Sequence, residues 1–349
     1  MTQRTLGHAI ARYELSEDDR RDIDVVTEGV LPVPFDLEDP ACLAALERSA
    51  FTLPADLVRF VTSFRYTEAT AAVIVSGFKI DDRAIGPTPS HWKANGGTAT
   101  TLKAELFLLL VASLLGDVFG WATLQGGRLV QNVLPIRNQE HEQSGHGSLA
   151  YLAWHTEDAF HPFRCDYLGL MAMRNHDRVP TTLASVDAID LPVAVRRVLA
   201  EPRFRIRPDD EHLNQTRREA LTDAGVPSLP RDWTEPPATA VLFGGQDTPY
   251  LRIDPIFMQP LENDPEADFA LRMIVDQLEA ALEDVVLDAG SVCIIDNFHA
   301  VHGRRSFRSR YDGTDRWLKK VLVTRDIRRS RAARRDVGSR VVEPTLFED

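Results

Sequence analysis

The sequence predicts a mainly β protein with helical additions, built as an antiparallel sandwich or jelly roll. Its second half alternates short apolar segments of strand character with loops rich in Pro, Gly, Asp and Asn. One long amphipathic helix interrupts this series, and no stretch has the composition of an interdomain linker. The expected strands are Ala71–Phe78, Arg128–Leu134, Tyr167–Arg174, Thr181–Val186, Ala238–Phe243, Ser291–Asp296 and Arg316–Thr324.

Two helices are predicted with definite ends. One covers Thr101–Val118 and stops before Gly120, and the other covers residues 265–287, with Asp264 as its N-cap. The expected buried face of the second helix consists of Phe269, Ile274, Leu278 and Leu282. We expect a single domain over 1–349, with a largely helical part in 1–100, the jelly-roll core in 101–331 and a tail in 332–349.

Composition narrows the range of functions. A formal net charge of −12 argues against a general nucleic-acid binder, which usually carries a basic surplus. Three scattered cysteines and the lack of an apolar leader suggest a reduced, cytoplasmic protein. The most apolar run, Leu106–Leu115, is too short to cross a membrane. The basic stretch Arg325–Arg340 is interpreted as a solvated tail, with a lid or docking segment as the alternative, and the oligomeric state stays open, a homodimer included.

A histidine and a carboxylate stand close together in His155-Thr156-Glu157. On an extended segment these two side chains point to the same side, so both can bind one metal ion. The pair is weak evidence by itself, because ten histidines and 52 acidic residues in this chain give about one or two such pairs by chance.

A second histidine strengthens the metal hypothesis. His302 follows a distant apolar segment and completes a set of two histidines and one carboxylate, which leaves positions open on Fe(II) for a cosubstrate and oxygen. Arg316 begins the next predicted strand, and its guanidinium is suited to a carboxylate of 2-oxoglutarate. Lys320 shares that face of the strand about 13 Å away, so one cation could hold the cosubstrate and the other the substrate carboxylate.

These residues resemble the clavaminate synthase-like family of Fe(II)- and 2-oxoglutarate-dependent oxygenases. The similarity is greatest to its bacterial hydroxylases of free amino acids such as arginine and asparagine. It extends from about Gly86 to Arg331. Besides the residues just named, it is carried by His155–Phe160, Val301–Arg304, Arg310–Lys319, Leu114–Thr123, Thr181–Ala184 and Arg207–Asp210.

The resemblance implies a double-stranded β-helix, the jelly roll of this family, with O₂ as the oxidant and 2-oxoglutarate as cosubstrate. It places the metal ligands at His155, Glu157 and His302, and the cosubstrate carboxylate at Arg316 and Thr181. Related halogenases have a small residue in place of the carboxylate ligand. Glu157 therefore implies hydroxylation rather than chlorination. The resemblance further implies attack at the β or γ carbon of an amino acid, in specialised metabolism such as antibiotic biosynthesis.

The expected substrate pocket departs from that of the arginine hydroxylases. A glutamine that contacts substrate there is replaced by Leu124, with Gln125 next to it, and the substrate-carboxylate arginine is replaced by Lys320. Of two aspartates that grip the guanidinium, Asp254 is kept and the other has become Ile256. Asp209 and Glu157 complete the expected substrate-binding set. Citrulline, asparagine, lysine, a cyclic arginine derivative and arginine itself all stay open.

Other histidines are expected to be structural. His299 lies three residues before His302, on the other strand face, and His141, His146 and His161 are interpreted as loop residues. Three alternatives to the free amino-acid hydroxylase are kept: a desaturase or cyclase of the same family, a hydroxylase of a carrier-bound amino acid, and a metal-binding jelly roll without catalysis.

Overall fold

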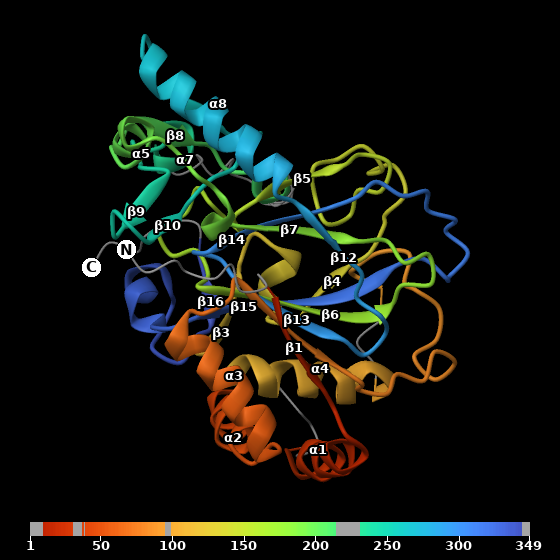
Figure 1. Ribbon diagram of the computed structural model, residues 1–349. Coiled ribbons are helices and arrows are strands. Elements are labelled where there is room, and N and C mark those ends of the chain that lie inside the picture. The colour runs from red at the N-terminus through yellow and green to blue at the C-terminus, as the bar shows by residue number, and fades with distance from the viewer. Residues whose placement is uncertain (1–9, 31–36, 38, 95–98, 214–230, 344–349) are drawn as a thin grey trace.

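Two β-sheets packed face to face organise the computed structural model, which describes residues 10–30, 37, 39–94, 99–213 and 231–343. Figure 1 shows the small sheet above the large one. Their facing sides share one apolar cluster, in which Leu168 and Leu318 of the large sheet meet Leu183 and Ala300 of the small sheet. This pair of mainly antiparallel sheets is the predicted jelly-roll core.

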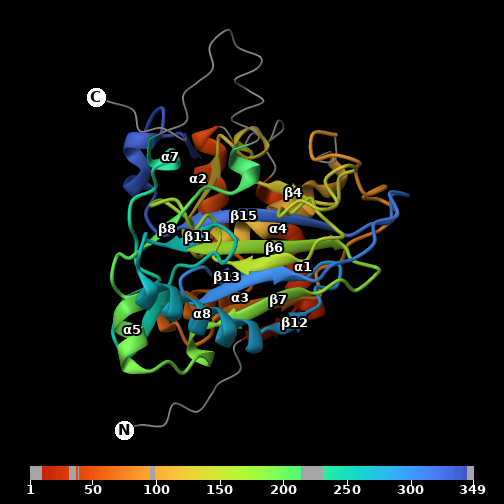
Figure 2. The ribbon, with the colours of Figure 1, turned by 90° about the horizontal axis from the view of Figure 1, so that it is seen from above.

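The large sheet has eight strands, several of which lie side by side when the molecule is seen from above (Figure 2). In sheet order they are β1 (Ile10–Glu14), β2 (Ala72–Ser76), β13 (Val292–Asp296), β6 (Tyr167–Arg174), β15 (Trp317–Thr324), β3 (Asp117–Trp121) and β16 (Val341–Val342), with β4 (Gln131–Val133) also paired to β15. Only the end pairs β1·β2 and β3·β16 are parallel in the described sheet.

The remaining strands form the small sheet and two separate two-stranded antiparallel pairs. The sheet order is β12 (Glu283–Val285), β7 (Thr181–Ser185), β14 (Ala300–Arg304) and β5 (Leu152–His155). The two-stranded pairs are β9 (Leu242–Gly244) with β10 (Pro249–Leu251), and β8 (Phe204–Ile206) with β11 (Met258–Pro260).

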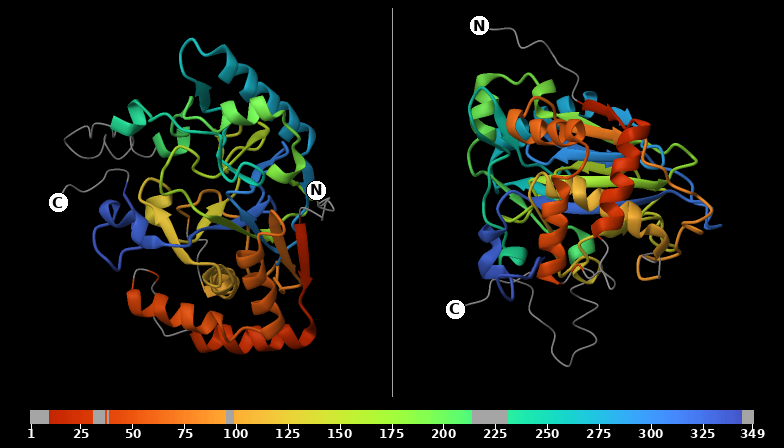
Figure 3. Two further views of the ribbon diagram at one scale, coloured as in Figure 1. Left: turned by 60° about the vertical axis from the view of Figure 1, so that its left-hand side comes forward. Right: turned by 90° about the horizontal axis from the view of Figure 1, so that it is seen from below.

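Helices cover the outer face of each sheet (Figures 1 and 3). Below the large sheet lie α1 (Glu17–Val30), α2 (Pro40–Ala50), α3 (Ala55–Thr67) and the buried α4 (Ala99–Ser113), which contacts β3, β6 and β15. Beside the small sheet lie α5 (Val193–Leu199), α7 (Arg231–Thr234) and α8 (Pro265–Ala280). The 3₁₀ segments are η1 (Gln125–Gly127), η2 (Val186–Ala188) and η3 (Ile327–Ala333). Among the described residues, no helix is both long and apolar enough to span a membrane.

Several predicted boundaries were wrong. The helix expected over Thr101–Val118 ends at Ser113, and Asp117–Trp121 forms β3 instead. The helix expected over 265–287 ends at Ala280, because Glu283–Val285 pairs with β7 as an edge strand. Local apolar periodicity cannot foresee either partner strand.

Smaller differences have similar causes. In the N-terminal part that was expected to be largely helical, Ile10–Glu14 forms an edge strand along β2. Of the expected strands, Arg128–Leu134 shortens to β4 and Ala238–Phe243 to β9, which begins only at Leu242. Phe269 is 54% exposed, because the buried stripe of α8 runs along Ala267, Ala270, Ile274 and Leu278.

The basic stretch that was expected to be a solvated tail packs against the body of the protein. Residues 327–333 form η3, and Val341–Val342 pair with β3. The buried Arg334 donates to the carbonyls of Ser339 and Val337, and Arg340 pairs with Asp117 and Glu47. The arginines thus stabilise a folded segment by binding carbonyls and acids, which their charge in the sequence does not reveal.

Candidate active site

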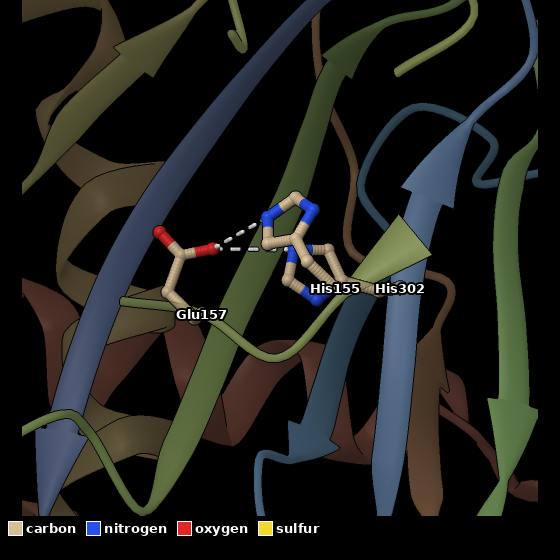
Figure 4. Close-up of side chains that lie close together, drawn as sticks. All are labelled: His155, Glu157 and His302. Carbon is tan, nitrogen blue, oxygen red and sulfur yellow. Dashed lines mark ion pairs between the residues drawn. The ribbon is translucent and has the colours of Figure 1, made fainter. Parts of the chain in front are cut away.

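The two predicted histidine ligands lie directly opposite each other on neighbouring strands. Antiparallel pairing of β5 with β14 puts His155 across from His302, with ring centroids 4.6 Å apart. Glu157 follows β5, and its Oε2 lies 3.8 Å from His155 Nε2 and 3.2 Å from His302 Nε2 (Figure 4). All three ligand atoms lie within 4.8 Å of one another, as a shared metal ion requires.

Neighbouring groups orient two of the three residues, His155 and Glu157. The ring nitrogen Nδ1 of His155 lies 2.8 Å from the carbonyl of Ala153, so Nδ1 donates there and Nε2 is left to bind a metal. The buried Asn297 accepts a hydrogen bond from the Glu157 amide at 2.6 Å and donates to the Glu157 carbonyl at 3.0 Å. Two imidazoles and one carboxylate held in this way fit the facial triad of Fe(II) oxygenases.

Lys320 of β15 donates to Glu157 Oε1 at 2.8 Å. Burial alone would raise the pKa of Glu157, but Lys320 and the two histidines hold it well below its ordinary value. Burial alone would lower the pKa of Lys320, but the negative charge of Glu157 has the larger effect and raises it. The ion pair therefore stays charged, and it links the large sheet to the triad.

A cavity between the two sheets opens onto the triad. Arg316, Leu318 and Lys320 line it from one face of the same strand segment, as the alternation predicted. The Arg316 Nη2 donates to Thr181 Oγ1 at 3.1 Å, whereas the buried Nε finds no acceptor within the described residues. Burial, with help from Arg304, lowers the pKa of Arg316 to about 9. A buried guanidinium with an unsatisfied donor favours an anionic partner such as a carboxylate.

Carboxylates line another part of the cavity and an adjoining one. Asp158, Asp209 and Glu211 line the first cavity with Leu124. The second cavity shares His155, Asp158 and Asp209 with the first and adds Asp254 and Ile256. The two cavities therefore meet beside the predicted metal ligands.

The structure brings together most of the predicted substrate residues, with one exception. Gln125 is buried and exchanges two hydrogen bonds with the main chain of Asn132, and it is absent from the described linings of both cavities. These bonds favour a structural role for Gln125, and its expected contact with substrate stays a prediction. Asp254 uses Oδ1 to accept from the amides of Ile256 and Phe257, and burial raises its pKa.

Sequence reasoning missed a buried chain of hydrogen bonds next to Glu157. Asp158 Oδ2 accepts from the Trp121 indole at 2.6 Å, and Asp158 Oδ1 lies 3.0 Å from His212 Nε2. On its other side, His212 Nδ1 lies 2.6 Å from Thr123 Oγ1. Asp209 and Glu211 are close neighbours of His212, so this network fixes the acidic side of the cavity. The sequence feature that could have pointed to this network is the position of Asp158 directly after Glu157.

The remaining histidines lie outside the triad. His299 contacts Asp296 at 3.2 Å and the ring of Tyr250. His141 is exposed, while His146 and His161 are buried, the latter against Trp121. His146 and His161 therefore lie in loops, as expected, but they are buried there rather than exposed.

Comparison with known proteins agrees with this geometry. No family model matches the chain. It is 42% identical over 316 residues to the L-ornithine/L-arginine 3-hydroxylase of Catenulispora acidiphila, covering 88% of this chain and 92% of that protein. It is 40% identical over 336 residues to the enduracididine beta-hydroxylase of Streptomyces hygroscopicus, covering 94% and 98%.

Solved structures give the same result. The non-heme iron oxygenase OrfP, in complex with Fe, succinate and (3S)-hydroxy-L-Arg, matches with a TM-score of 0.90 and 40% identity, over 95% of this chain and 99% of OrfP. Another structure of OrfP, with Fe and alpha-ketoglutaric acid, matches with a TM-score of 0.85. The chain therefore belongs to the clavaminate synthase-like family of Fe(II)- and 2-oxoglutarate-dependent oxygenases, among its amino-acid hydroxylases.

Proposed function

We propose that this enzyme hydroxylates the β carbon of a free, basic L-amino acid. The observation that carries the proposal is the set of carboxylates beside the triad, from Asp209, Glu211 and Asp254. Buried or half-buried carboxylates of this kind favour a cationic ligand, because an ion pair offsets the loss of hydration. The relatives named for ornithine, arginine and enduracididine are 3- or β-hydroxylases, which supports the choice of carbon.

His155, Glu157 and His302 are proposed to hold Fe(II), and Arg316 with Thr181 to hold the distal carboxylate of 2-oxoglutarate. The metal fits because three ligand atoms converge there. The cosubstrate fits because a buried guanidinium with an unsatisfied Nε opens into the same cavity. When bound, the iron, oxygen and 2-oxoglutarate supply the oxidising power, and the protein supplies position.

The chain's own residues are proposed to orient the amino acid. Asp209 and Asp254 each use one carboxylate oxygen for main-chain amides, so the other oxygen can receive the basic end of the substrate. Leu124 contributes apolar surface to the wall. Ile256 stands where a second acid would strengthen binding of a guanidinium, which keeps ornithine, lysine and a cyclic arginine derivative as candidates beside arginine.

A substrate panel tests the proposal. The purified enzyme with Fe(II), ascorbate and 2-oxoglutarate is incubated with arginine, ornithine, lysine, enduracididine, citrulline and asparagine, and products are identified by mass spectrometry. We expect a gain of one oxygen, at carbon 3, for at least one basic member. Turnover restricted to citrulline or asparagine would contradict the basic-substrate proposal. Loss of two hydrogens would identify a desaturase, and turnover only of carrier-bound amino acids would exclude a free substrate.

We also propose that the chain acts as one oxygenase domain in the cytoplasm. Three scattered free cysteines, all buried, support the reducing compartment. The cavity contains side chains from both sheets, which supports a single catalytic unit.

A further inference from the structure

A buried ion pair connects the large sheet to the metal-binding residues. Lys320 Nζ lies 2.8 Å from Glu157 Oε1, and the two side chains are only 14% and 8% exposed. Lys320 comes from the middle of β15, where its neighbours are Gln131 of β4 and Leu170 of β6. Glu157 follows β5 of the small sheet. The contact therefore fixes the carboxylate from the opposite side of the cavity.

The two oxygens of Glu157 have separate partners. Oε2 faces Nε2 of both histidines, whereas Oε1 is bonded to the ammonium of Lys320. A carboxylate that binds a metal with both oxygens takes two coordination positions, and one that uses a single oxygen takes one. Holding Oε1 away from the triad therefore preserves one more position for cosubstrate and oxygen.

Lys320 has further capacity beyond this bond. A lysine ammonium has three donors, and the group also lines the cavity, where Asp158 and Glu211 are the other nearby charges. The expectation from the sequence was that Lys320 binds the substrate carboxylate. The observed contact gives it a second task that does not require substrate.

We propose that Lys320 is a positioning residue of the iron site, which restrains Glu157 to bind the metal through Oε2 alone. This inference rests on the proposed function of His155, Glu157 and His302 as metal ligands. It predicts that replacing Lys320 alters the metal site even when substrate and cosubstrate are absent. A residue that served only as a substrate anchor would change substrate binding and leave the metal site unaltered.

The test uses Co(II) as the probe, because its visible d–d spectrum reports coordination number and geometry. Metal-free wild type, Lys320→Met and Lys320→Arg are titrated with Co(II) without 2-oxoglutarate or amino acid. We expect a changed spectrum for Lys320→Met, and about tenfold tighter Co(II) binding because a cation near the ion has been removed. Lys320→Arg keeps the charge and a donor, so it should retain the wild-type spectrum.

The outcomes separate the inference from the proposed function. If Lys320→Met gives the wild-type spectrum at saturation, the inference is overturned, whatever happens to the KM of the amino acid. If wild type itself binds no stoichiometric Co(II), or if His302→Ala binds it equally well, the proposed metal site is wrong. Circular dichroism and thermal melting establish that each variant is folded, and Lys320→Leu, which also lacks a donor, replaces Lys320→Met if the latter unfolds.

Discussion

Replacement of Arg316 should weaken the binding of 2-oxoglutarate far more than the binding of the metal. Arg316 is buried, and its one described side-chain bond is to Thr181 Oγ1 at 3.1 Å. Truncating one member of a buried, hydrogen-bonded charge pair costs about 2–5 kcal/mol. At about 1.4 kcal/mol per factor of ten, Arg316→Met should raise the Kd of 2-oxoglutarate roughly 30-fold to 3,000-fold.

Two further variants should weaken the binding of 2-oxoglutarate by smaller amounts. Arg316→Lys keeps the charge and loses the planar fork, so we expect a loss of about 10-fold to 100-fold. Thr181→Val removes a single neutral partner worth about 1 kcal/mol, so roughly fivefold is expected. Arg325→Met, which changes a half-exposed arginine just after β15, serves as the control and should bind 2-oxoglutarate normally.

Calorimetric titration of 2-oxoglutarate into Mn(II)-loaded protein measures each Kd directly. A 2-oxo acid without the distal carboxylate provides a matched ligand, because Arg316→Met should bind it as wild type does. Arg316 is not the carboxylate anchor if Arg316→Met binds 2-oxoglutarate within threefold of wild type. The same conclusion follows if the variant raises the Kd of both ligands equally.

Three other predictions concern the surroundings of the triad. Asn297→Ala should lower the free energy of unfolding by about 2–4 kcal/mol in denaturant titrations, because several buried bonds to Glu157 and Cys165 are lost; a change below 1 kcal/mol would contradict this. His212→Asn should raise the KM of the amino acid about tenfold without altering the Kd of 2-oxoglutarate, since His212 positions Asp158 and Asp209 in the cavity. Equal effects on the KM and the Kd would count against that role. The Co(II) affinity of the metal-free protein should rise about tenfold per pH unit up to about pH 9 and then level off. Burial would lower the pKa of His155, but Glu157 and Asp254 raise it to about 9, and only the neutral imidazole binds a metal ion. A Co(II) affinity that stays constant from pH 7 to 9 would refute this reasoning.

The residues proposed to form the active site could be named from the sequence because their chemistry is local in the chain. On an extended segment, side chains two residues apart point to the same side, as His155 and Glu157 do. The same alternation along β15 put Arg316 and Lys320 on one face. What the spacing could not give was the pairing of His155 with His302, which requires the register of β5 on β14.

Residues that act through long-range contacts escaped prediction. Asn297 and His212 have ordinary positions in the sequence, and their roles arise only when distant segments meet. The bonds of the Gln125 side chain to the main chain of Asn132 were likewise not foreseen from its position beside Leu124. The basic stretch was misjudged for a similar reason, since Arg340 pairs with Asp117 and Glu47, which are far away in the sequence.

The most direct test of the central claim is a reaction under ¹⁸O₂ with a basic amino acid that the panel shows to be turned over. The account predicts one labelled oxygen in the hydroxylated amino acid and one in succinate, in equal amounts. His302→Ala should form neither, whereas His299→Ala, which changes a histidine outside the triad, should form both. Hydroxylation that takes its oxygen only from water, or that persists at the wild-type rate in His302→Ala, would contradict the account.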